Sequence, residues 1–143
     1  MKRVGTALGL VLALTAFMPR DSQAQGARGK KAEATLRQNY PNPFNPETRI
    51  QFGVGDPPVC TDNGKQYRVS LKIFNLLSQL VAVPVLQGSG QLLDNVTVSC
   101  GEYKAYWDGK VLNTGREAAS GVYYYRLEVN GVPLPLKRML VAK

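Results

Sequence analysis

The chain has 143 residues, a formal net charge of +8, no histidine and two cysteines. Without histidine a serine or cysteine nucleophile lacks its usual base, and two thiols are too few to hold zinc, so neither chemistry is expected. Basic and acidic residues are interspersed, which indicates a solvated surface and argues against a nucleic-acid partner. The length suits one domain and not two.

The first 24 residues are predicted to be a secretory signal peptide. Lys2 and Arg3 supply positive charge, residues 4–17 are apolar, and residues 22–24 form a small-x-small cleavage site. The apolar run is shorter than the roughly 20 residues that span a bilayer, so an uncleaved anchor is the less favoured alternative. The sequence therefore predicts an exported chain with no transmembrane helix in its mature part.

The mature chain is expected to begin with a flexible basic tail and a proline-rich segment. Residues 25–35 carry basic and small side chains, which cannot form a core. The segment Asn39-Tyr40-Pro41-Asn42-Pro43-Phe44-Asn45-Pro46 follows, and its prolines constrain the backbone and remove three amide donors. We expect an extended, polyproline-like lead-in that Tyr40 and Phe44 pin to the core. Such a segment starts a domain and does not carry chemistry.

Short segments with alternating apolar side chains fill the rest of the chain. They predict strands at residues 48–54, 67–75, 80–86, 92–100, 103–107, 121–130 and 134–142. The third contains Pro84 and is expected near a sheet edge, and Asn130-Gly131 predicts a tight hairpin turn. Residues 75–82 are ambiguous, but they are too few for a helix. This pattern predicts an all-β sandwich over residues 36–143.

The predicted inward faces of these strands are apolar. They comprise Ile50, Phe52 and Val54; Val69, Leu71 and Ile73; Tyr123, Tyr125, Leu127 and Val129; and Met139 and Val141. A buried tyrosine of this stripe is expected to bond the backbone through its hydroxyl, as in a tyrosine corner.

The two cysteines are expected to form one disulfide, because the predicted chain is exported. Cys60 lies in the loop after the first strand, and Cys100 lies beyond the third strand and the turn that follows it. In an up-and-down succession these two strand exits lie at the same end of a sandwich. Closing a loop of about 40 residues would stabilise the fold by roughly 4 kcal/mol.

Five motifs in order make residues 36–143 resemble a family of C-terminal β-sandwich modules in bacterial surface and secreted proteins. These modules are type IX secretion (type A) sorting domains, also described as hook-capping-protein Ig-like domains. The motifs are residues 36–50, which contain the proline segment, residues 69–75, Trp107-Asp108-Gly109, residues 120–127 with Gly121, Val122 and Tyr123, and residues 137–143.

The resemblance implies an Ig-like antiparallel β-sandwich of about seven strands, without enzymatic activity, cofactor or metal. Family members usually direct a larger cargo across the outer membrane. The expected location is the cell surface, the outer membrane or the medium, with the periplasm as the alternative. The expected partner is a secretion or envelope protein that could pair with an edge strand. The candidate recognition strand consists of Lys137, Arg138, Met139, Leu140, Val141 and Lys143.

The chain departs from the family pattern at three points. Ser78-Gln79 replaces the turn glycine after the second strand, and the two loops that carry cysteine are longer than usual. Only about ten residues separate the predicted cleavage site from the module, so no cargo is expected there.

Two other classes of function stay open. A carbohydrate- or ligand-binding module would present Trp107 and Tyr124 exposed on one face, although Trp107 is expected at the end of the core. An enzyme would need a concave pocket with carboxylates of perturbed pKa. Asp56 and Asp62 could approach calcium, but no loop of alternating acidic ligands surrounds them.

Overall fold

The structure is a computed structural model that describes Gly5 and residues 33–143. The expected signal peptide and the beginning of the expected tail lie outside the described residues. The described part contains no helix and forms ten strands. These are β1 (Ala34–Leu36), β2 (Thr48–Val54), β3 (Gln66–Phe74), β4 (Leu80–Ala82), β5 (Val85–Leu86), β6 (Val96–Ser99), β7 (Gly101–Trp107), β8 (Gly121–Val129), β9 (Val132–Pro133) and β10 (Lys137–Val141).

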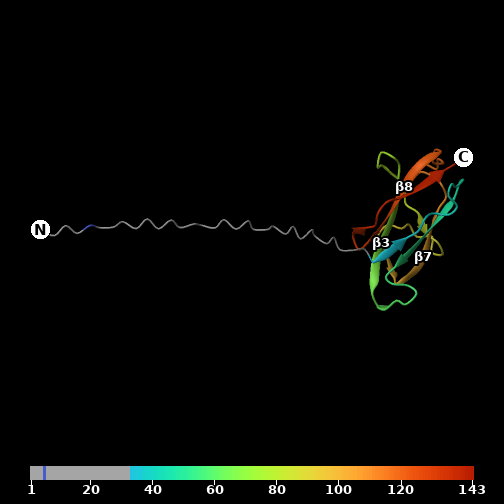
Figure 1. Ribbon diagram of the computed structural model, residues 1–143. Coiled ribbons are helices and arrows are strands. Elements are labelled where there is room, and N and C mark those ends of the chain that lie inside the picture. The colour runs from blue at the N-terminus through green and yellow to red at the C-terminus, as the bar shows by residue number, and fades with distance from the viewer. Residues whose placement is uncertain (1–4, 6–32) are drawn as a thin grey trace.

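The strands form two antiparallel sheets, which confirms the predicted all-β sandwich. One sheet has the order β1-β2-β7-β5. The other has the order β10-β8-β3-β4, with β6 also paired to β3 and β9 to β8. Figure 1 shows β3 and β8 in one layer and β7 in the other. The predicted inward faces are buried between the two sheets, with Ile50, Leu71, Tyr125 and Met139 fully inaccessible to solvent. Alternation along each strand therefore identified the core faces.

The predicted strand at residues 80–86 is wrong as a single element. The chain changes sheets within it, because β4 pairs with β3 whereas β5 pairs with β7 of the other sheet. Pro84 lies between the two strands and has no amide hydrogen, so it cannot continue a ladder.

Other strand boundaries also differ from the predictions. Within residues 92–100 only β6 is a strand. Leu93 is buried in the loop before it, and the Leu93 amide donates to the carbonyl of Pro84. Of the last predicted strand, residues 134–142, only β10 is a strand, and β9 lies before this range. Ala34 and Thr35, expected in the tail, belong to β1 and pair with β2. A three-residue strand is too short to show alternation.

Two local predictions are confirmed. Asn130 and Gly131 connect β8 to β9, and their φ angles are 51° and 78°. Positive φ at both positions is what a two-residue type I′ turn requires. Cys60, in the loop between β2 and β3, forms a disulfide with Cys100, between β6 and β7, with their Cα atoms 5.7 Å apart.

The proline segment does not form the expected extended lead-in. It runs as a series of bends, interrupted by isolated bridges from Tyr40 to Arg49 and from Phe44 to Val141. Phe44 is buried and packs edge-on against Trp107, with ring centroids 5.4 Å apart. Tyr40 is 80% exposed, so the prediction that it pins the segment to the core is wrong. Paired residues share one face of a sheet, and Arg49 faces solvent, so Tyr40 does too.

Candidate functional site

Asn39, at the start of the proline segment, is a buried polar hub. It is 2% exposed, and its backbone N–H donates to the Tyr125 hydroxyl at 2.9 Å. Its side-chain amide donates to the carbonyl of Pro41 and to the Thr48 hydroxyl, each at 3.1 Å. Gln38 Nε2 donates to Asn39 Oδ1 at 2.7 Å. The backbone N–H, side-chain amide and side-chain oxygen of Asn39 therefore all bond to protein groups and organise the segment from inside.

The Tyr125 hydroxyl joins β8 to the chain ahead of the proline segment. It donates to the carbonyl of Arg37 at 2.7 Å while it accepts from the Asn39 amide. Burial raises the pKa of Tyr125 to about 12. Tyr123 makes a similar bond to the Ala119 carbonyl at 2.8 Å, and burial also raises the pKa of Tyr123. Both tyrosines match the predicted core tyrosine with a backbone-bonded hydroxyl.

The candidate recognition strand, β10, is held by residues that we call the clamp: Gln38, Asn42 and Phe44. The Phe44 amide donates to the Leu140 carbonyl at 3.0 Å, and the Leu140 amide donates to Asn42 Oδ1 at 3.0 Å. The Ala142 amide donates to the Phe44 carbonyl at 3.1 Å. Gln38 Nε2 donates to the Arg138 carbonyl at 2.7 Å.

The clamp occupies the outer backbone edge of β10, opposite to β8. A partner strand would therefore have to displace the clamp before it could pair with this edge. What β10 does present is its alternate side chains, because Arg138 and Leu140 are exposed whereas Met139 and Val141 are buried. Lys137 is half-buried, and Lys143 forms an exposed ion pair with Glu117 at 3.4 Å.

Trp107, Asp108 and Gly109 form a structural corner. Trp107 is 3% exposed, lies between Phe44 and Tyr123, and donates from Nε1 to the Lys110 carbonyl at 3.0 Å. Asp108 accepts the Lys110 amide at 3.0 Å. Tyr124 lies on the outer face of β8, on the far side of its sheet from Trp107. The two rings cannot form one sugar-stacking platform.

The remaining predicted motif residues lie along β8 and in the proline segment. Gly121 opens β8 opposite Val141, Val122 is half-buried on the outer face, and Tyr123 is in the core. Pro41, Pro43, Asn45 and Pro46 are exposed at the bends. The structure thus brings the motifs at residues 39–46, 107–109 and 121–123 together around Trp107 and β10.

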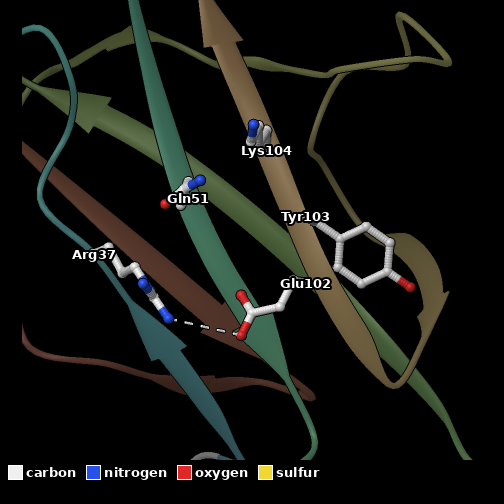
Figure 2. A pocket seen from close by; sticks show the side chains of 5 residues that line it. All are labelled: Arg37, Gln51, Glu102, Tyr103 and Lys104. Atoms are coloured by element: carbon white, nitrogen blue, oxygen red, sulfur yellow. Dashed lines mark ion pairs between the residues drawn. The ribbon is translucent and has the colours of Figure 1, made fainter. Parts of the chain in front are cut away.

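A shallow hollow lies on the outer face of the β1-β2-β7-β5 sheet. It has a volume of about 230 Å³ and is lined by Arg37, Gln51, Glu102, Tyr103 and Lys104. Figure 2 shows Arg37 reaching towards Glu102 across β2, while Tyr103 points to the other side of β7. The Arg37–Glu102 ion pair is 3.9 Å long, and both side chains are more than half exposed. Such a pair contributes little stability and does not define a binding site.

A larger hollow of about 570 Å³ lies beside the disulfide and is lined in part by Asp56, Asp62, Lys65 and Glu33. The Thr61 hydroxyl and amide both bond the Asp56 carboxylate, and these bonds lower the pKa of Asp56. Lys65 Nζ lies 2.7 Å from Glu33 Oε2. Asp56 and Glu33 are thus engaged by protein partners, and the described residues contain no cluster of three or more potential metal ligands.

An exposed pair of leucines, which the strand pattern does not reveal, lies in the turn between β3 and β4. Leu76 is 66% exposed and Leu77 is 77% exposed. The only signal was the stretch Asn75-Leu76-Leu77-Ser78, which places two leucines between turn-forming residues. Ser78 has a φ of 60°, so it occupies the left-handed position where the resembled family has glycine.

Within the described residues, no helix has the length and apolar character needed to cross a membrane. Comparison with known proteins found no matching family model, no matching curated protein and no matching solved structure.

Proposed function

We propose that this protein is an exported, non-enzymatic β-sandwich module of the type IX sorting kind, which acts in export or surface attachment by contacting a secretion or envelope protein. The proposal rests on the hydrogen bonds between the first and last motifs of the resembled family, residues 36–50 and residues 137–143. Asn42 and Phe44 bond to Leu140 and Ala142, so the C-terminal strand is held in a fixed conformation. A sorting signal needs such a surface, because one receptor must recognise it in the same form each time.

The recognised groups would be the outward side chains of β10, Arg138 and Leu140, together with Lys143 next to the strand. The alternative, pairing of a partner strand with β10, would require release of the clamp. The Cys60–Cys100 disulfide supports an oxidising compartment, as expected for a cell-surface, extracellular or periplasmic protein. The proposal favours the surface or the medium.

The test is the destination of the full chain in a bacterium that has type IX secretion and in its isogenic secretion mutant. Intact mass would be measured in medium, surface and periplasmic fractions. In the competent strain we expect the species at the surface or in the medium, two hydrogens lighter than the reduced chain. In the mutant we expect it in the periplasm. Equal release from both strains, or retention in both, would contradict a sorting role.

A pair of variants tests the recognition strand itself. Arg138→Glu combined with Leu140→Ser changes two exposed side chains of β10 and should lower the surface fraction severalfold. Arg116→Glu, in an exposed loop, is the matched charge reversal and should leave the fraction unchanged. Thermal melting of each purified variant would establish that both remain folded. Equal export of the two variants would remove β10 as the recognised element.

A further inference from the structure

The outer face of the β10-β8-β3-β4 sheet brings together apolar and cationic side chains from distant parts of the chain. Three cross-strand pairs lie next to one another on it: Val122 with Leu140, Tyr124 with Arg138, and Lys72 with Arg126. Tyr124 also pairs with Phe74, which in turn pairs with Leu80 of β4. The side chains of residues paired directly across two strands lie within contact distance of each other.

One end of this face is apolar. Eight large apolar side chains in the described residues are exposed, and four of them gather here: Leu76 (66%), Leu77 (77%), Leu80 (45%) and Leu140 (38%). We call these four the leucine patch. Leu76, Leu77 and Val122 line one open hollow of about 210 Å³. Grouped exposed leucines indicate an interaction surface, whereas scattered ones do not.

The turn that carries Leu76 and Leu77 is already ordered. The Asn75 side-chain oxygen accepts the amides of Leu77 and Gln79, each at 3.0 Å. The Ser78 amide donates to the Asn75 carbonyl at 3.0 Å, and the Asn75 amide donates to the Gln79 carbonyl at 3.1 Å. The two leucines are thus presented on a fixed backbone, so burying them on another surface requires little further loss of backbone entropy.

Three cations, Lys72, Arg126 and Arg138, lie beside the leucine patch on this face. Lys72, Arg126 and Arg138 form no ion pair with any described residue. The Arg126 guanidinium lies 5.4 Å from the centre of the Phe74 ring. Lys72 and Arg126 are direct cross-strand neighbours of like charge, which is unfavourable in a sheet and would be relieved by an anion. Glu128, the acid on this face of β8, belongs to the next row, opposite Ser70.

The charge and the flatness of this face decide between possible occupants. A second copy bound face to face would oppose three cations to three cations. The hollow at the leucine patch is smaller than the roughly 300 Å³ at which small-molecule pockets begin. A bilayer surface requires no pocket, because apolar side chains enter the interfacial region while Lys and Arg meet anionic headgroups.

We propose that this face docks the protein peripherally on a membrane with anionic headgroups. The leucine patch enters the interfacial layer, and Lys72, Arg126 and Arg138 contact the headgroup phosphates. Long basic side chains suit this position because their stems lie along apolar surface while their charges reach the phosphates. This inference goes beyond the sorting proposal and does not depend on it.

The test is sedimentation of the chain lacking residues 1–24 with vesicles of equal parts phosphatidylglycerol and phosphatidylcholine, compared with pure phosphatidylcholine. We expect binding to the anionic vesicles and little to the neutral ones. Each of Lys72→Gln, Arg126→Gln and Arg138→Gln should weaken partitioning about fivefold. Leu76→Ser combined with Leu77→Ser should weaken it about tenfold or more.

Matched controls lie on the other sheet and in a loop. The triple variant Lys72→Gln, Arg126→Gln, Arg138→Gln removes three charges from the proposed docking face. The triple variant Arg37→Gln, Arg49→Gln, Lys104→Gln removes the same charge from the outer face of the β1-β2-β7-β5 sheet and should change binding far less. Val59→Ser alters an apolar side chain that is 75% exposed elsewhere and should have no effect.

Three results would overturn the proposal. The first is absence of binding to the anionic vesicles. The second is equal loss of binding in the two triple variants, which would indicate attraction by net charge and not by this face. The third is a dimer in sedimentation velocity that Leu76→Ser with Leu77→Ser dissociates, which would make the face an interface between copies. Thermal melting would verify that each variant stays folded.

Discussion

Gly109 lies so close to Pro46 that a Cβ atom added to the glycine would be 2.0 Å from the Pro46 carbonyl oxygen. The two residues belong to motifs about 60 positions apart in the sequence. Gly109 also has a φ of +80°, in the left-handed region that other residues rarely adopt. The glycine is therefore required both by its own backbone conformation and by the close passage of the proline segment.

Gly109→Ala should lower the free energy of unfolding by about 3 kcal/mol, because left-handed strain adds to a backbone clash. The matched control is Gly115→Ala. Gly115 has a φ of +65° and no atom within 4 Å of an added Cβ, so only the strain of about 1 kcal/mol applies. Urea unfolding measures both variants. Equal losses of unfolding free energy in the two variants would mean that the close approach of Pro46 adds no cost to an alanine at position 109.

Tyr125→Phe should lower the free energy of unfolding by about 2 kcal/mol. The change leaves the Arg37 carbonyl and the Asn39 amide without the hydroxyl that bonds both. Tyr124→Phe is the control on the same strand, and its cost should stay within about 0.5 kcal/mol because Tyr124 lies on the outer face. A cost for Tyr125→Phe no greater than that of the control would show that the hydroxyl bridge does not stabilise the fold.

Stability should fall in alkaline solution. Burial raises the pKa of Tyr125 to about 12, above its ordinary value near 10. Between these pH values the unfolded chain has lost the phenol proton while the folded chain retains it. The free energy of unfolding therefore decreases as pH rises, by at most about 1.4 kcal/mol per pH unit for this group. Urea unfolding across this range should show a shallower decrease in Tyr125→Phe. An unchanged slope would contradict the assignment.

Asn42→Ala should loosen the C-terminal strand without unfolding the protein. Asn42 Oδ1 accepts the Leu140 amide, which would be left to solvent. We expect faster hydrogen exchange at Leu140 and a loss of about 0.5–1 kcal/mol in the free energy of unfolding. Asn45→Ala, three residues along the same exposed segment, should change neither. Unaltered exchange at Leu140 in Asn42→Ala would show that this side chain does not hold the edge.

The Cys60→Ser, Cys100→Ser double variant should lose up to about 4 kcal/mol, because the disulfide closes a loop with a sequence separation of 40. Urea unfolding of the wild-type protein in strong reductant should give the same midpoint as the double variant. A midpoint unchanged by both treatments would mean that the other contacts of the β2–β3 loop already restrain it.

Several features of the fold followed from local pattern alone. Alternation identified the inward faces of β2, β3 and β8, because side chains on a strand point to opposite faces in turn. The hairpin between β8 and β9 could be predicted from the pair Asn130-Gly131, because few residue pairs accept positive φ at both positions. The disulfide followed from the presence of only two cysteines in a chain expected to be exported.

The arrangement of the candidate surfaces did not follow from local pattern, because it depends on which distant segments meet. The sequence of residues 80–86 does not reveal that the chain changes sheets at Pro84, because the residues on both sides of the proline are apolar. The two halves differ only in their partner strands, which are β3 for β4 and β7 for β5. Exposure of Tyr40 is decided by its bridge to Arg49. The outer edge of β10 is hydrogen-bonded to Asn42 and Phe44, which lie about 100 residues earlier in the chain.

The class of fold, the core faces, the hairpin and the disulfide could thus be predicted from residue type and short-range spacing. The clamp along the outer edge of β10, and the position of four exposed leucines beside three cations that form no ion pair with other described residues, became apparent only from the folded structure. These features arise from cross-strand register between segments far apart in the chain, and register is set by the packing of the whole sandwich.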